Sequence, residues 1–234
     1  MVDTIEVAPA TVLSCVELST RELNALLHEM TDGSRVVITE PRGRHNLGVG
    51  ISKSLDIKIA GNAGYFIGGL CEGPSIVIDG FVGWSVGENL MSGTIRVRGN
   101  ASESAGASSH GGVVIIEGDA SSRAAISLKG GTVAVGGDVG HMSAFMAQAG
   151  ILLVGGDAGD SLGDSLYEAV IYVAGKVRSL GADAQFEELT DADVAVVTDL
   201  VSLTGFDHIK PGDVTKIASA RQLYNFDALK DQRY

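Results

Sequence analysis

The amino-acid sequence predicts an all-β solenoid: a right-handed parallel β-helix of about seven coils, capped by short α-helices at both ends. Two observations predict this fold. A glycine recurs every 19 residues, and a short run of β-branched or aliphatic residues precedes it. The recurring glycines are Gly61, Gly80, Gly99, Gly118, Gly137, Gly156 and Gly175. A repeat of this length is one coil of a solenoid, and neighbouring coils stack to bury a continuous core.

The runs before the recurring glycines predict the strands. Six runs share one register: Ile76-Val77-Ile78, Ile95-Arg96-Val97, Val114-Ile115-Ile116, Val133-Ala134-Val135, Leu152-Leu153-Val154 and Ile171-Tyr172-Val173. Because successive side chains of a strand point to opposite faces, the first and third residues of each run are expected to point inward and to stack between coils. The other glycines of each coil are expected at its corners, where positive φ or close backbone approach is needed.

Both ends of a solenoid need covering, because a bare terminal coil exposes unpaired backbone groups. Ser19 and Glu22 have the spacing of a capping box, and apolar residues at helical spacing follow until Gly33. Thr190 is placed to N-cap a second helix that ends at Gly205. We expect these two helices to cover opposite ends of the rod. The predicted regions are an N-terminal helix and strand cap (1–50), the β-helix (51–187), and a C-terminal helical cap with an interface tail (188–234).

An apolar stripe is predicted on the outside of the coils. The middle residue of each run should face outward, yet only Arg96 is charged there. A stripe of this length has to be covered, either by the terminal helices or by another polypeptide. The tail from Phe206 to Tyr234 combines aromatic and basic residues, which is typical of a protein interface; the alternative is that it folds back on its own rod. The candidate interface residues are Val77, Ile115, Leu153, Tyr172, Phe206, Arg221, Tyr224 and Phe226.

Composition and spacing exclude several classes of function. A net charge of −12, with the 17 Lys and Arg residues scattered, argues against nucleic acid as a partner. There is no apolar stretch of about 18 residues that would span a membrane and no signal-peptide pattern, so a cytoplasmic location is expected.

No chemistry-bearing cluster is apparent in the sequence. The five histidines are dispersed, and Cys15 and Cys71 lack metal-ligand spacing. The Gly48-Val49-Gly50 segment lacks the third glycine of a dinucleotide fingerprint. Trp84 is interpreted as a corner filler rather than a stacking platform. We therefore expect no catalytic, cofactor-binding or metal-binding residue in this chain.

The glycine pattern also resembles that of a known family. Gly-x-x-Gly-x-x-x-Gly recurs, as in Gly61-Asn62-Ala63-Gly64 to Gly68 and Gly80-Phe81-Val82-Gly83 to Gly87. This is similar to the GXGXG β-helix domain at the C-terminal end of the glutamate synthase large subunit, which also occurs as the C subunit of formylmethanofuran dehydrogenase. The similarity covers roughly residues 50 to 185. The segments Ser179-Leu180-Gly181-Ala182-Asp183-Ala184 and Ser219-Ala220-Arg221-Gln222-Leu223-Tyr224-Asn225-Phe226 look most like the B subunit of N-methylglutamate synthase.

The resemblance implies a free-standing β-helix subunit, since the chain has neither the amidotransferase domain nor the flavin barrel of glutamate synthase. Such a subunit would be a non-catalytic scaffold that binds no cofactor itself and holds an amidotransferase-like subunit and an FMN-binding subunit together. The favoured complex is N-methylglutamate synthase, which makes N-methylglutamate from methylamine and glutamate. Two alternatives stay open. One is the C subunit of a formylmethanofuran dehydrogenase or formyltransferase-type complex, and the other is a self-assembling β-helix binding protein.

Overall fold

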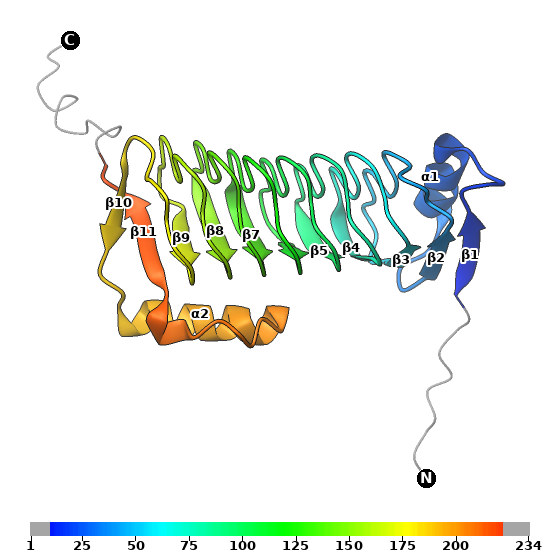
Figure 1. Cartoon of the computed structure of the whole chain (residues 1–234). Coiled ribbons are helices and arrows are strands. Elements are labelled where there is room, and N and C mark those ends of the chain that lie inside the picture. Colours follow the sequence, from blue (N-terminus) through cyan, green and yellow to red (C-terminus); the bar gives the residue numbers. More distant parts are fainter. Residues whose placement is uncertain (1–9, 222–234) are drawn as a thin grey trace, which may run out of the picture.

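Within residues 10–221, which the structure describes, the strands form one sheet along the length of the rod in this computed structural model (Figure 1). The strands are β1 (Thr11–Ser14), β2 (Arg35–Thr39), β3 (Asp56–Ala60), β4 (Glu72–Ile78), β5 (Ser92–Val97), β6 (Val113–Ile116), β7 (Lys129–Val135), β8 (Ala149–Val154), β9 (Val170–Val173), β10 (Ala184–Glu187) and β11 (Thr215–Ser219). In space they run in order from β1 to β9, followed by β11 and then β10.

Neighbouring strands from β1 to β9 are parallel, as expected for stacked coils. From β3 onward each residue pairs with the one 19 positions later, so Ile57 pairs with Ile76 and Leu152 with Ile171. The first and third residues of all six predicted runs are at most 1% exposed. The predicted aliphatic ladders and the solenoid fold are therefore confirmed.

The sheet begins before the regular repeat does. Val36 in β2 pairs with Ile57, which is 21 residues later, and Val12 in β1 pairs with Val37, which is 25 residues later. Strands at these unequal spacings continue the same parallel ladder. The 19-residue pattern could not reveal them, because a coil of different length leaves the strand in place while shifting its position in the sequence.

Helix α1 (Thr20–Glu29) covers the first coil, as predicted. Ser19 closes the expected capping box, and Leu23 and Leu27 are fully buried in the main core. Asn24 bonds two backbone groups of the coil below, donating to one at 2.7 Å and accepting from the other at 2.9 Å. The helix thus seals the apolar ladder while satisfying backbone groups at the end of the rod.

Helix α2 (Asp191–Thr204) forms where it was predicted but lies elsewhere. Thr190 is its N-cap, and Gly205 ends it in the left-handed conformation with φ 77°. It runs along the flank of β7 to β9 and does not cover the end of the rod (Figure 1). The prediction of a helical cap at the C-terminal end was wrong in this respect.

Strands rather than a helix close the C-terminal end. The chain leaves α2 through a short 3-10 helix (Pro211–Asp213) and returns as β11. This strand pairs antiparallel with β9 on one side and with β10 on the other. The antiparallel pair occupies the edge that a further coil would otherwise fill.

The recurring glycines are needed for close approach between coils rather than for backbone freedom. Among the seven, only Gly61 has positive φ. A Cβ at Gly99 would lie 2.9 Å from the Gly80 backbone, and one at Gly137 would overlap the side-chain oxygen of Asp119. Each glycine makes room for the coil before it.

Positive φ occurs instead at a turn made partly of other residues. Ser85 and Asn89 have φ of 60° and 54° on either side of Gly87, and the pattern recurs in the next coil. Non-glycine residues in this conformation cost about 1 kcal/mol each. Hydrogen bonds between coils hold them there, such as that from the Ser85 N–H to the Glu103 carbonyl oxygen at 2.9 Å.

Candidate functional site

The apolar stripe predicted as a partner interface is covered by the chain itself. Ile115, Leu153 and Tyr172 are at most 3% exposed and pack with Ala134 in a second apolar cluster. The covering residues are Val197, Leu200, Phe206, Ile209 and Val214, from α2 and the segment after it. Ile115, Leu153, Tyr172 and Phe206 therefore form an intramolecular interface, and their assignment to a partner surface is corrected. Of the two covers proposed for the stripe, the structure has the terminal helix.

A buried polar cluster fixes the N-terminal end of α2. The Tyr172 hydroxyl donates to Asp193 Oδ1 at 2.7 Å, and Lys216 Nζ donates to Asp193 Oδ2 at 3.1 Å. Burial alone would raise the pKa of the Asp193 carboxyl, but hydrogen bonds from Thr190, Tyr172 and Lys216 outweigh it and hold that pKa below its usual range. Burial and the neighbouring Asp193 carboxylate raise the pKa of the Tyr172 phenol. The cluster anchors a helix and leads into no substrate-sized cavity of its own.

The other predicted interface residues remain separate from this cluster. Val77 is half-buried in β4, beyond the described end of α2, and Arg221 is exposed with its N–H donating to Ser219 Oγ at 3.0 Å. Tyr224 and Phe226 lie outside the described residues. The role of the tail in an interface stays a prediction.

Exposed aromatic rings stack along one corner of the rod. His45 and Tyr65 have ring centroids 4.1 Å apart with planes 12° from parallel, and Tyr65 and Trp84 are 5.1 Å apart at 14°. The Tyr65 N–H donates to His45 Nδ1 at 2.9 Å, which fixes this nitrogen as the acceptor. Tyr65 is 45% exposed and Trp84 52% exposed. We call His45, Tyr65 and Trp84 the aromatic ladder.

The interpretation of Trp84 as a corner filler was wrong. Its ring stacks on Tyr65 with half its surface open, so it is a stacking platform. The sequence contained the signal: Tyr65 and Trp84 are separated by 19 residues, one coil, and must lie above one another in a solenoid. Gly83 completes the arrangement, because a Cβ there would lie 2.6 Å from the Tyr65 ring.

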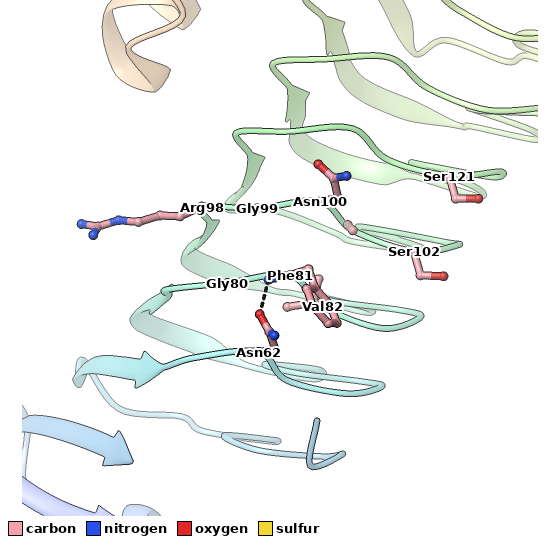
Figure 2. Close-up of a pocket in the computed structure, with 10 residues that line it drawn as sticks. Asn62, Gly80, Phe81, Val82, Arg98, Gly99, Asn100, Ser102 and Ser121 are labelled. Carbon is pink, nitrogen blue, oxygen red and sulfur yellow. Dashed lines mark hydrogen bonds between the residues drawn. The ribbon is translucent and has the colours of Figure 1, made fainter. Parts of the chain in front are cut away.

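A groove runs beside the aromatic ladder. Three cavities of about 560, 430 and 700 Å³ share lining residues in sequence: Arg42 lines the first two, and Asn62 and Phe81 line the last two. Figure 2 shows the third cavity, with Phe81 between Asn62 and Asn100 and with Ser102 and Ser121 further along. We call these joined cavities the Phe81 groove. His45 also lines its first part, which connects the groove to the ladder.

A column of Asn and Asp side chains forms one wall of the groove and continues beyond it. Asn62 Oδ1 accepts from the Phe81 N–H at 3.1 Å (Figure 2), and Asn100 Oδ1 accepts from the Asp119 N–H at 3.0 Å. Asp119, Asp138 and Asp157 repeat this bond to the residue 19 positions later, at 2.9, 2.6 and 2.7 Å. The column was missed in the sequence, although each member directly follows a recurring glycine.

Charge differs between the two halves of this face. The Phe81 groove is lined by Arg42, Arg44 and Arg98, with Glu40 as the single carboxylate. A separate cavity of about 610 Å³ in the second half has a different lining: Asp138, Asp157, Asp160, His141, Lys176 and Arg178. The first half therefore has a local excess of positive charge on a chain whose net charge is −12.

A comparison of the whole sequence places it among known proteins. Protein GlxC of Rhizobium meliloti (strain 1021) is 48% identical over 210 residues, which cover 88% of this chain and 92% of that protein. The chain belongs to the GlxC family. No family model matches the sequence.

The thiols of this GlxC-family chain are in surroundings that favour the protonated form. Burial raises the pKa of Cys71 to about 11, and its Sγ donates to the Gly48 carbonyl oxygen at 3.0 Å. Burial also raises the pKa of Cys15, by more than the nearby Arg44 lowers it. A nucleophilic cysteine needs the opposite shift.

Three histidines of this GlxC-family chain have structural contacts in the described region. His28 and His208 bond the carbonyl oxygens of Val49 and Gly136 at 3.1 and 3.0 Å, and His45 belongs to the aromatic ladder. Between residues 10 and 221, no three His, Cys, Asp or Glu side chains are grouped to hold a metal ion. Neither helix in that range has the length and apolar character needed to cross a bilayer.

Proposed function

We propose that this chain is a non-catalytic scaffold subunit of a glutamate synthase-like complex, with N-methylglutamate synthase as the favoured complex. In this proposal it holds an amidotransferase-like subunit and an FMN-binding subunit together. It binds no cofactor itself, and the complex as a whole makes N-methylglutamate from methylamine and glutamate. The resemblance of its glycine repeat to the GXGXG β-helix domain supports the choice of complex.

The observation that carries the scaffold role is the distribution of apolar surface. The rod covers its own stripe with α2, yet it leaves Tyr65, Phe81 and Trp84 about half exposed on two adjacent coils. Clustered exposed aromatics are typical of surfaces that bind other proteins. A solenoid presents such a surface along a rigid axis, which suits a subunit that positions others.

The chemistry-bearing side chains support the same role. In the described region the cysteines are buried with raised pKa values, and the Tyr172–Asp193–Lys216 cluster is used to anchor a helix. A general base or nucleophile has to reach a substrate in a cavity. The described side chains with such groups are engaged in holding the fold.

The test is to purify the full-length chain, with an affinity tag, from its own cells and to measure the assembly by native mass spectrometry. The expected result is a heteromeric complex that contains an amidotransferase-like chain and a flavoprotein, with FMN in the flavoprotein. The complex should form N-methylglutamate from methylamine and glutamate. The separately expressed chain is the control, and it should show no flavin absorbance.

Other outcomes would contradict the proposal in distinguishable ways. Association with a tungsten or molybdenum enzyme would indicate the formylmethanofuran-type complex instead. A stable homo-oligomer or monomer with no heteromeric partner would indicate a self-contained binding protein.

A further inference from the structure

The exposed apolar surface of the rod is concentrated at one place. Tyr65, Phe81 and Trp84 are 45, 55 and 52% exposed, and all three lie on the two coils between Gly61 and Gly99. Phe186 on β10, the other aromatic side chain of similar exposure in the described region, lies at the C-terminal end of the rod (Figure 1). The aromatic ladder and Phe81 are therefore the main surface left for a partner once α2 has covered the stripe.

The aromatic ladder is rigid before any partner binds. Stacking and the bond from the Tyr65 N–H to His45 Nδ1 hold the rings in place. The stack ends at Trp84, since the next residue of the column, Glu103, has no ring. Aromatic side chains that are already ordered lose little entropy on binding, and such residues dominate binding energy at interfaces.

The extent of the Phe81 groove suits an extended polypeptide. From Gly43 to Asn100 the groove crosses three steps between coils. At about 4.8 Å a step this is about 14 Å, or about four residues of extended chain. The length exceeds what a single planar ring would occupy.

The polar groups of the Phe81 groove are mostly donors. The Oδ1 atoms of Asn62 and Asn100 already accept backbone N–H groups, so their Nδ2 groups remain to donate, and they have no acceptor within residues 10–221. Ser102 and Ser121 add hydroxyls. Arg42 is 74% exposed and its only described ion-pair partner is Glu40, at 2.8 Å. Donors and positive charge favour an occupant rich in carboxylates.

We propose that the Phe81 groove and the aromatic ladder bind an extended acidic segment of a partner subunit, with an apolar or aromatic side chain of that segment packed against Trp84 and Phe81. This inference rests on the proposed function and names the contact that a partner subunit uses. The aromatic rings contribute most of the affinity. Arg42 and Arg44 select the carboxylates and accelerate association.

The first experiment compares truncations within the assembled complex. Phe81→Ala and Trp84→Ala should each weaken association of the partner by at least tenfold, because truncation of a central aromatic residue of an interface has effects of this size. Phe186→Ala is the matched control, since Phe186 is 59% exposed, and it should leave association unchanged. Trp84→Phe should recover most of the loss. Equal melting temperatures of the isolated variants will show that the rod is intact.

The second experiment tests the charge. Arg42→Gln should slow association several-fold at low salt, and the difference should shrink as salt is raised. Arg178→Gln is the control, because Arg178 is 73% exposed and also ion-paired, but borders the acidic half of the face. Equal association rates for both variants would overturn the preference for an acidic segment.

The third experiment identifies the occupant. A photoreactive p-benzoylphenylalanine at position 81 should cross-link to a peptide of a partner subunit that contains Asp or Glu residues, and one at position 186 should not. Cross-links from position 81 to either end of this chain, to a second copy, or to a basic peptide would overturn the proposal. An intact complex without cross-links from position 81 would overturn it while leaving the scaffold function standing, whereas absence of any heteromeric complex would refute the scaffold function itself.

Discussion

The guanidinium of Arg96 donates to the carbonyl oxygen of Thr204 from both Nη atoms, at 3.0 and 3.1 Å. These two residues are 108 positions apart, and the bond joins β5 to the last turn of α2. A cation at this end of a helix satisfies orphan carbonyl groups and interacts favourably with the helix dipole. The single charged residue of the apolar stripe therefore lies where its cover ends.

Replacing Arg96 should destabilise the attachment of α2. Arg96→Ala removes the bonds to Thr204 and the ion pair with Glu117 at 3.0 Å, so we expect a loss of about 1–2 kcal/mol in the free energy of unfolding. Arg96→Lys should lose less, because one cation remains near the carbonyl groups. Urea denaturation of the three proteins measures the difference. An unchanged unfolding midpoint for Arg96→Ala would show that apolar packing alone holds the helix.

The pH dependence of stability should report on Asp193. Its pKa in the folded protein is below the unfolded value of 3.8, so its contribution is complete above pH 4 and is lost as the pH falls from there toward the lowered pKa. We expect Asp193→Asn to cost about 2 kcal/mol near pH 6 and less near pH 3. The measurement is urea denaturation across this range.

Asp191→Asn is the matched control for this pH effect. Asp191 is in the same first turn of α2 but is exposed. Its replacement should cost only a few tenths of a kcal/mol through the helix dipole. Parallel pH profiles for wild type and Asp193→Asn would contradict the expected role of the buried carboxylate.

A methyl group at a recurring glycine should separate two coils. In Gly156→Ala the new Cβ would lie 2.7 Å from the Gly137 backbone carbon, which cannot move away as a flexible side chain could. We expect the free energy of unfolding to fall by about 2–3 kcal/mol. Gly212→Ala has open space around the new Cβ and should change little. Thermal unfolding of both variants compares them, and equal melting temperatures would contradict the close-approach explanation.

The stacked aspartates should repel one another while their side-chain oxygens remain useful. Asp138→Asn keeps an acceptor for the Asp157 N–H, now bonded at 2.6 Å, and removes one of three like charges on successive coils. We expect it to stabilise the rod by a few tenths of a kcal/mol at low salt, and by less at high salt. Asp138→Ala removes the acceptor and should destabilise by about 1 kcal/mol. Thermal melts at two salt concentrations distinguish these effects, and identical melts would mean that the column contributes nothing.

The fold was predictable where it depends on repetition. The inward ladders, such as Ile95 on Ile76, follow from an alternation of faces that is repeated at a fixed spacing. The strands before residue 51 were not predictable in this way, because Val36 and Ile57 are separated by 21 residues. The boundaries of α2 followed from local capping by Thr190 and Gly205, which act within one turn.

The placement of α2 and the candidate site depend on contacts across the fold. The sequence of the helix determines which of its faces is apolar, but does not determine whether that face meets the end or the flank of the rod. Two long-range contacts determine that, Tyr172 with Asp193 and Arg96 with Thr204. The aromatic ladder could have been found from the spacing of Tyr65 and Trp84, whereas the 20 residues from His45 to Tyr65 hide its first ring.

The two anchored ends of α2 make this helix a measure of coil number. From Arg96 to Tyr172 there are four steps between coils, or about 19 Å, and a helix of 14 residues is about 21 Å long. Gain or loss of a whole coil inside this interval would leave one anchor out of reach, while the same change between Gly61 and Arg96 would leave both in place. Insertions and deletions of whole repeats during evolution are therefore tolerated in the first half of the rod and selected against in the second.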